Sequence, residues 1–128
     1  MQVLVNNRVV NYMMTGKGPM AVLLHGWADS SVTFTALTTH LKSNYTVVAL
    51  DLAGFGNSQP PNSAWGLQEY AESVANTLTK LDIKNVHLLI GHSNGGAIAM
   101  YAVAHQLVQP KKLVLLASSG IRTEPQPG

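Results

Sequence analysis

Apolar positions along the chain follow two patterns that alternate with each other. Four short runs are apolar almost throughout and predict buried β-strands, at residues 20–26, 45–51, 86–91 and 111–118. Longer segments between these runs predict helices, at residues 30–43, 67–81 and 95–108. In the second helix the apolar residues recur every three or four positions and mark one face: Leu67, Tyr70, Val74, Leu78 and Leu81.

The first predicted helix has a recognisable start. Ser30 or Ser31 is placed to cap it, because a serine oxygen accepts a hydrogen bond from a free N–H group of the first turn. We expect its inner side to carry Val32, Leu37 and Leu41.

The N-terminal residues predict a hairpin. Two short apolar segments, at residues 3–5 and 8–14, are joined by Asn6 and Asn7, and asparagine tolerates the left-handed conformations that a tight turn requires. Met13 and Met14 are expected to pack within this hairpin.

Strands that alternate with helices, and that are apolar throughout, are typical of an α/β fold with a sheet covered on both faces. We therefore predict a three-layer α-β-α sandwich around a mostly parallel sheet of about six strands, with the hairpin antiparallel. In such sheets ligands bind outside the carboxyl ends of the strands. Three loops follow those ends, "HGWADS" at 25–30, "DLAGFGNS" at 51–58 and "GHSNGG" at 91–96, and we expect them to form the site.

Composition narrows the function classes. The 128 residues carry a formal charge of +2, and their eight basic residues are scattered, which argues against nucleic acid as a partner. The absence of cysteine excludes disulfides and thiolate metal sites, and no metal or cofactor is expected. No stretch is typical of a signal peptide or membrane span, so we expect a soluble, cytoplasmic chain.

The glycines around Ser93 fit one of three known motifs. A phosphate-binding loop needs Lys and then Ser or Thr after Gly96, but Ala97 follows. A dinucleotide-binding loop needs Gly-x-Gly-x-x-Gly, which neither glycine-rich loop contains. What remains is Gly-x-Ser-x-Gly from Gly91 to Gly95, the nucleophile elbow between a strand and a helix. A turn that merely links the strand to the helix is the alternative.

With its three loops in this order and at these separations, the chain resembles the α/β-hydrolase family from about residue 8 to residue 121. The resemblance implies that Ser93 is the nucleophile and that the backbone N–H groups of Trp27 and Asn94 form the oxyanion hole. Asn94 also begins a predicted helix, whose free N–H groups and dipole favour a developing negative charge. Trp27 and Phe55 are candidates for lining an acyl pocket.

The resemblance also implies later elements, namely a cap segment and two more strands that carry an acid and a histidine. After Ser93 the chain has one histidine, His105, and one acid, Glu124, in the reverse of the family's order. The position directly after the sixth strand, where a variant of the family keeps its acid, reads Ala117-Ser118-Ser119. We therefore expect one truncated domain at residues 1–120, a flexible tail at 121–128 and an incomplete triad.

Four histidines that precede Ser93 in the chain are candidates for the missing base. His25 is the best candidate, because the strands before His25 and Ser93 are neighbours in the family's sheet; its alternative role is to support the loop beside the oxyanion hole. His92 is bonded to the nucleophile in a turn that aims the two side chains apart. His87 lies inside a strand and is expected to pack there, and His40 lies at a helix end in solvent.

Two acids that precede Ser93 are candidates for supporting roles. Asp51 resembles the family's structural aspartate, whose carboxylate holds the following loop through backbone N–H groups. Asp29 is placed either to orient His25 or, more simply, to cap the next helix.

The last predicted strand bears on assembly. If it ends the sheet, its apolar edge is open to another chain, and pairing with a second copy covers both edges. We therefore expect a homodimer through this strand, with Lys111 and Lys112 as the visible protection against open-ended association.

Three functions follow from these observations. The first is a compact serine esterase with weak activity on small esters, and this interpretation favours an enzyme. The second is half of a two-piece hydrolase that receives its acid and histidine from another polypeptide. The third is a non-catalytic fragment or interaction domain.

Overall fold

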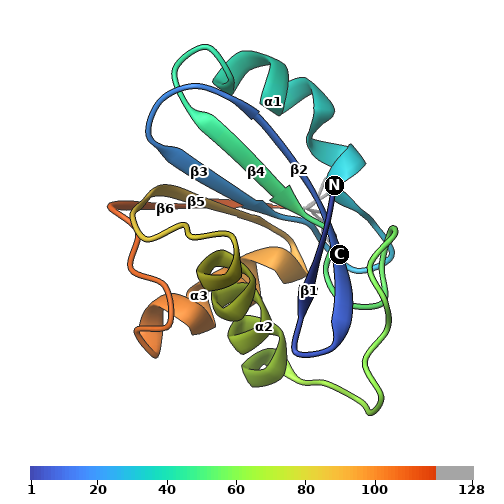
Figure 1. Ribbon diagram of the computed structural model, residues 1–128. Coiled ribbons are helices and arrows are strands. Elements are labelled where there is room, and N and C mark those ends of the chain that lie inside the picture. Colours follow the sequence, from blue (N-terminus) through green and yellow to red (C-terminus); the bar gives the residue numbers. More distant parts are fainter. Residues whose placement is uncertain (118–128) are drawn as a thin grey trace, which may run out of the picture.

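A computed structural model describes residues 1–117, so the predicted tail, Glu124 and the serines at 118 and 119 lie outside the described part. The strands are β1 (Gln2–Val5), β2 (Arg8–Gly16), β3 (Met20–Leu24), β4 (Thr46–Leu50), β5 (Val86–His92) and β6 (Lys112–Leu116). The helices are the short 3-10 helix η1 (Ser31–Phe34) and the α-helices α1 (Thr35–Leu41), α2 (Leu67–Lys80) and α3 (Asn94–Ala104) (Figure 1).

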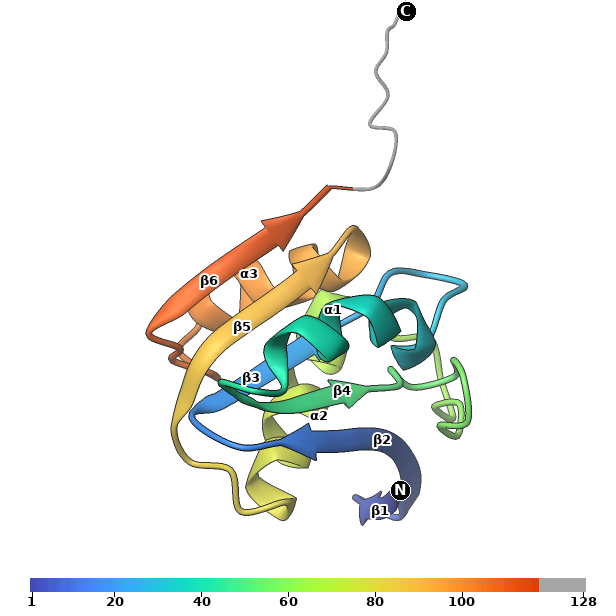
Figure 2. The same ribbon diagram turned by 90° about the horizontal axis from the view of Figure 1, so that it is seen from above.

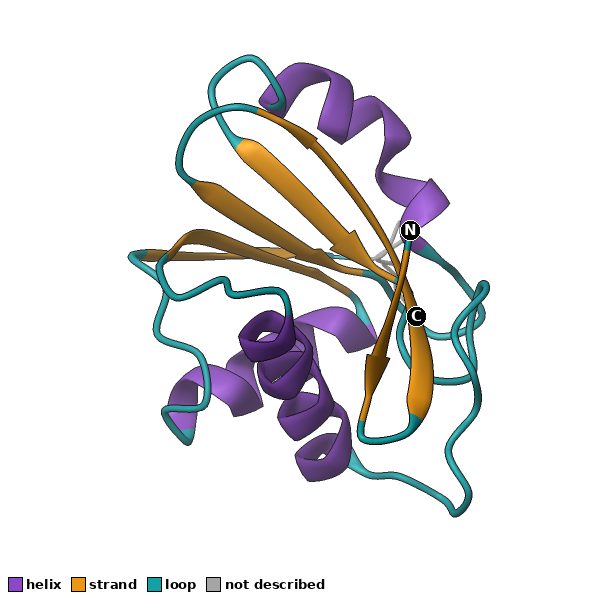
Figure 3. Cartoon of the chain, viewed as in Figure 1, coloured by secondary structure: helices purple, strands orange, loops and turns teal. Residues whose placement is uncertain are grey.

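The six strands form one sheet in the order β1-β2-β4-β3-β5-β6. The hairpin β1-β2 and the pair β2-β4 are antiparallel, whereas β4, β3, β5 and β6 run parallel to one another. Helix α1 covers one face, and α2 and α3 cover the other (Figure 3). Seen from above, β1 and β2 lie at one end of the sheet and β6 at the other (Figure 2). The predicted three-layer α/β sandwich is therefore confirmed.

The hairpin turns at the two asparagines, as predicted. Asn6 and Asn7 have φ angles of 51° and 64°, and Val5 pairs with Arg8 across the turn. Met14 packs against the buried cluster on the α2 and α3 side of the sheet, and Met13 packs on the α1 side.

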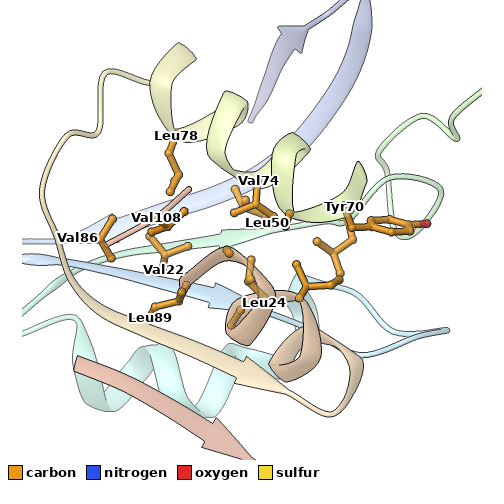
Figure 4. Packing of buried hydrophobic residues seen from close by; sticks show 14 of the residues in the cluster. Val22, Leu24, Leu50, Tyr70, Val74, Leu78, Val86, Leu89 and Val108 are labelled. Atoms are coloured by element: carbon orange, nitrogen blue, oxygen red, sulfur yellow. The ribbon is translucent and has the colours of Figure 1, made fainter. Parts of the chain in front are cut away.

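The core lies on both faces of the central strands. After its first residue every position of β3 and β4 is buried, because these strands have a neighbour on each side and helices on each face. Tyr70, Val74 and Leu78 of α2 pack against Val22, Leu24, Leu50 and Leu89 of the sheet (Figure 4). The predicted inner face of this helix is thus confirmed at its centre, while Leu67 at its start is 41% exposed.

The predicted helix at 30–43 is wrong in one respect. Its first turn is the 3-10 helix η1, which has about three residues per turn, so Ser31 and Phe34 share the inner side. Val32 instead points to solvent with 74% of its surface exposed. The Ser30 cap is confirmed, since its hydroxyl accepts a hydrogen bond from the Val32 N–H.

The helix predicted to reach residue 108 ends at Ala104. Gln106 adopts a left-handed conformation with φ of 60°, and the Leu107 N–H then donates to the Ala102 carbonyl at 2.8 Å. This backbone turn satisfies the last free carbonyls of the helix and closes it. No helix within residues 1–117 is long and apolar enough to cross a membrane.

Candidate active site

Ser93 occupies a sharp turn between β5 and α3. Its backbone angles, φ 58° and ψ −119°, lie in a region that residues with a side chain rarely adopt. The flanking glycines make the turn possible: a Cβ on Gly91 would lie 2.5 Å from the Gly95 oxygen, and one on Gly95 would collide with the carbonyl groups of Leu24 and His25. The glycine spacing predicted this close approach of helix and strand.

The turn leaves the Ser93 side chain exposed at the carboxyl end of the sheet. The loop after β3 comes next to it, since a Cβ on Gly26 would lie 3.5 Å from the Ser93 Oγ. The backbone N–H groups of Trp27 and Asn94 have no hydrogen-bond partner among residues 1–117. The site therefore combines the exposed Ser93 hydroxyl with two backbone donors. One is the N–H of Asn94, the residue after Ser93, and the other is the N–H of Trp27, the residue after Gly26.

The loop after β4 is organised around the Asp51 carboxylate. It accepts hydrogen bonds from the Ser31 N–H at 2.8 Å, from the Asn57 N–H at 3.0 Å and from the side-chain amide of Asn11 at 2.9 Å. Burial alone would raise the pKa of Asp51, but these donors outweigh it and hold the pKa below its ordinary value. The predicted structural role of Asp51 agrees with this geometry.

A second set of bonds closes the same loop. The Ser58 hydroxyl donates to the Asp51 carbonyl at 2.7 Å and accepts from the Asn11 N–H at 2.8 Å. Gly56 passes so close to the carboxylate that a side chain there would collide with it, and its φ of 54° also favours glycine. The loop is thereby fastened to β2 as well as to β4.

His25 joins two of the three loops. Its Nδ1 lies 2.6 Å from the Gly26 carbonyl oxygen, and its Nε2 accepts a hydrogen bond from the Leu52 N–H at 2.9 Å. Because Nε2 accepts, the proton of the neutral ring lies on Nδ1. The ring is fully buried, and this burial lowers the pKa of His25 despite the bond to Gly26 and the nearby carboxylates of Asp51 and Asp29.

These bonds use both ring nitrogens of His25, so the geometry favours its alternative role as a support for the loop. The base role assigned from the sequence stays a prediction. Asp29 does not orient the ring; its carboxylate accepts from the Ser30 N–H at 2.9 Å, at the start of η1.

The other histidines lie in different surroundings. His105 follows α3, at the opposite end of that helix from Ser93, and stacks on Tyr101 with ring centroids 3.9 Å apart. His87 packs near Tyr45, and His40 is exposed, both as predicted. His92 is partly buried, and its Nδ1 has no partner within the described residues.

Aromatic side chains form a row beside the site. Trp27 lies with its ring 5.2 Å from that of Phe55 and 4.9 Å from that of Tyr70. Trp65 continues the row against Tyr70, and the Arg8 guanidinium lies 4.3 Å above the Trp65 ring. Trp27 is 43% exposed, so the row presents an apolar surface next to the loop that contacts Ser93.

A cavity of about 440 Å³ lies at the other end of the sheet. It is lined by the end of α2, by residues 106–109 and by Val86, the first residue of β5, whereas Ser93 follows the last residue of that strand. The cavity is therefore remote from Ser93, which faces open surface.

Three residues at the site have roles that the sequence does not predict. Asn11 lies in no motif although its amide bonds the Asp51 carboxylate, and Tyr70 fits the helix face although its hydroxyl also donates to the Ala53 carbonyl. Ser58 lies within "DLAGFGNS", and its hydroxyl donates to the Asp51 carbonyl. The serine within "DLAGFGNS" was the one available signal, because a hydroxyl seven residues after a buried aspartate can close the loop on it.

The chain is similar in sequence to known hydrolases. Residues 20–127 match the family model described as alpha/beta hydrolase fold. An uncharacterised protein of Mycobacterium tuberculosis is 36% identical over 109 residues, which are 85% of this chain and 31% of that protein. A pimeloyl-[acyl-carrier protein] methyl ester esterase of Pseudoalteromonas atlantica is 35% identical over 105 residues, 81% of this chain and 39% of the esterase.

Among solved structures, a bacterial membrane phospholipase A superposes with a TM-score of 0.86 at 32% identity, over 92% of this chain and 39% of the phospholipase chain. The chain thus spans about a third to two fifths of the length of the relatives named above. The family model covers far more than half of the chain and its fold agrees. The chain belongs to the family of proteins with the alpha/beta hydrolase fold.

Proposed function

We propose that the chain carries the nucleophile and the oxyanion-binding groups of a serine hydrolase that acts on esters. The observation that carries this proposal is Ser93 itself, an exposed hydroxyl held in a strained turn beside two backbone N–H groups that have no partner among residues 1–117. Strained backbone persists where the surrounding structure imposes it, and such residues cluster at active sites. The similarity to an esterase and a phospholipase supports the same reaction class.

In the proposed reaction the Ser93 Oγ attacks the ester carbonyl carbon and loses its proton. The carbonyl oxygen becomes an oxyanion, which accepts hydrogen bonds from the Trp27 and Asn94 N–H groups. When the carbonyl reforms, the alcohol leaves with a proton and an acyl-serine remains. Water then attacks that ester, releasing the acid and restoring the hydroxyl.

The proton acceptor decides how fast this reaction runs. His25 is bound through both nitrogens, so its support for the oxyanion loop is the role we propose for it. Without a base beside the serine, oxyanion stabilisation and binding alone give about a thousandfold acceleration over water in enzymes whose triad is removed. We therefore expect weak turnover by residues 1–128.

The acyl side of the substrate is expected to be apolar. Trp27 and Phe55 offer aromatic surface beside the nucleophile, and burial of aliphatic groups against it contributes about 25 cal/mol per Å². Small activated esters with short aliphatic acyl groups suit this open surface.

The test is hydrolysis of 4-nitrophenyl acetate and butyrate by the purified chain. We expect a rate above that of buffer, which Ser93→Ala lowers while Ser63→Ala, at an exposed loop serine, leaves it unchanged. A fluorophosphonate probe should release fluoride and form a bond between phosphorus and the Ser93 Oγ, detected as added mass on that peptide.

Other outcomes select the other functions. If Ser93→Ala retains the full rate, Ser93 is not the nucleophile. If the wild-type chain hydrolyses the esters no faster than buffer and the probe does not label it, the chain is non-catalytic. If the wild-type chain is labelled at Ser93 but turns over ester only after a second polypeptide is added, it is one part of a two-piece hydrolase.

A further inference from the structure

The loop that carries Trp27 has few backbone hydrogen bonds of its own. Among residues 1–117, the backbone N–H and carbonyl groups of Trp27, Ala28 and Asp29 have no hydrogen-bond partner. Ala28 also has a φ of 60°, a left-handed conformation that favours glycine. Such a conformation persists where neighbouring groups impose it. Side chains must therefore fix the direction of the Trp27 N–H.

The Trp27 ring lies against two aromatic rings from different parts of the fold. Phe55, in the loop after β4, has its ring centroid 5.2 Å away, and Tyr70, in α2, has its ring centroid 4.9 Å away with the planes at 61°. Aromatic pairs favour tilted or edge-to-face arrangements with centroids about 4.5–7 Å apart. Both contacts meet this condition, so together they restrict how the indole can turn.

The two supporting rings are themselves anchored. Tyr70 is buried, and its hydroxyl donates to the Ala53 carbonyl at 3.1 Å. The Phe55 N–H donates to the Leu52 carbonyl at 2.9 Å, and the Phe55 ring meets the buried His25 ring edge-on at 5.8 Å. The loop after β4 and helix α2 therefore both act on Trp27 through its side chain.

We propose that Tyr70 and Phe55 are positioning residues of the oxyanion hole. By holding the Trp27 ring, they aim the Trp27 N–H at the place where the oxyanion forms beside Ser93. This role rests on the proposed function, because it concerns the same donor in the same reaction. The other donor, the Asn94 N–H, is fixed differently, since Asn94 begins α3.

Substitutions that remove one ring test the positioning role. Tyr70→Leu and Phe55→Leu should each slow the labelling of Ser93 by a fluorophosphonate when the probe is saturating, so that weaker binding of the probe does not contribute. A misplacement of about 1 Å costs roughly a hundredfold in rate, and we expect losses of about tenfold to a hundredfold. Tyr70→Phe keeps the ring and should restore a rate close to that of the wild-type chain.

A control variant separates positioning from lost packing. Val74, one turn after Tyr70 in α2, is also buried, so Val74→Ala removes core contacts of the same helix without removing a ring. We expect it to be labelled at the wild-type rate. Circular dichroism checks the fold of each variant, and Phe55→Leu, at a partly buried loop position, gives the test if Tyr70→Leu does not fold.

NMR follows the Trp27 N–H directly. The chain has two tryptophans, so isotope labelling of tryptophan gives two backbone amide signals, and Trp65→Phe identifies that of Trp27. In the labelled wild-type chain the phosphonyl oxygen on Ser93 takes the place of the oxyanion and accepts a hydrogen bond, which should shift the Trp27 amide proton downfield. Tyr70→Leu should reduce this shift, and Val74→Ala should retain it.

Failure of the positioning role is distinguishable from failure of the nucleophile. If the wild-type chain shows the Trp27 shift and both leucine variants match it in rate and in shift, the rings do not position the donor. Equal slowing in Val74→Ala would also overturn the proposal, because lost packing then explains the effect. Labelling of Ser93 without a Trp27 shift removes Trp27 as a donor, whereas a wild-type chain that is not labelled at Ser93 contradicts the proposed function itself.

Discussion

The loops after β4 and β5 differ in how many of their polar groups are hydrogen-bonded within the protein. Around Asp51, each carboxylate oxygen accepts at least one hydrogen bond, and the residue is 3% exposed. Around Ser93, the hydroxyl faces solvent and the adjoining Trp27 and Asn94 N–H groups lack partners within the described residues. The Asp51 carboxylate is thus fully engaged within the protein, whereas the two backbone donors beside Ser93 have no partner among residues 1–117.

The two loops contribute differently to the stability of the fold. A buried charge is tolerated only when it is fully hydrogen-bonded, so Asp51 contributes to stability. Unpaired donors and a strained backbone lower stability, so their presence at Ser93 points to function. His25 connects the loop after β4 to the loop after β3, which carries Gly26 and Trp27 beside Ser93. Substitutions at Asp51, His25 and Ser93 should therefore change the free energy of unfolding by different amounts.

The largest effect is expected from Asp51→Ala. The change leaves the Ser31 and Asn57 N–H groups and the Asn11 amide without their acceptor, and each unpaired buried donor costs about 1–3 kcal/mol. We expect the free energy of unfolding in urea to fall by about 3 kcal/mol.

Asp29→Ala serves as the control, since that carboxylate accepts one hydrogen bond, from the next residue, and should lower stability by less than about 1 kcal/mol. Equal losses in the two variants would remove the special role of Asp51.

A smaller effect is expected from acid. Because the pKa of His25 is lowered in the folded protein, the unfolded chain binds a proton more readily, and His25 stabilises the fold above pH 6.5. This contribution is lost as the pH falls from 6.5 toward the folded-state pKa, with a slope of at most about 1.4 kcal/mol per pH unit. Urea unfolding between pH 7 and 5 measures it.

The slope of the free energy of unfolding against pH, between pH 7 and 5, should become smaller in His25→Gln, whose amide does not titrate. It should persist in His40→Gln, where an exposed ring is replaced. A slope that is the same in His25→Gln and the wild-type chain would mean that other groups cause the acid sensitivity. The lowered pKa of Asp51 adds stability that is fully present above pH 3.8 and is lost only below it, so this contribution is constant between pH 7 and 5.

The smallest effect is expected at the elbow. Ser93→Gly relieves the positive φ of 58° and should raise the free energy of unfolding by about 1 kcal/mol while it removes the nucleophile. Ser93→Ala keeps the strain and should stay within about 0.5 kcal/mol of the wild-type chain. If glycine destabilises this position, the turn is not strained and the comparison between the loops fails.

The sequence was a good guide where the information is local. Glycines at fixed distances from Ser93 predicted the turn, because only residues without a Cβ fit where helix and strand touch. Local spacing failed at Val32, where a 3-10 turn replaced the expected α-helical turn and shifted the inner face to Ser31 and Phe34.

Contacts between distant segments were harder to foresee. Asn11 meets Asp51 because β2 pairs antiparallel with β4, a register that no periodicity encodes. The engagement of both nitrogens of His25 likewise depends on how the loop after β4 folds back. Bonds across about 27 to 47 residues of chain require the tertiary structure itself.

The position of β3 in the sheet has a consequence for synthesis on the ribosome. Both neighbours of β3, β4 and β5, come later in the chain, and β5 ends only at His92. One edge of β3 therefore stays unpaired for the time needed to add about 70 residues, roughly 4 to 14 seconds at bacterial and eukaryotic rates. During that interval this apolar edge is exposed to chaperones and to aggregation, because β4 can cover only the other side of β3.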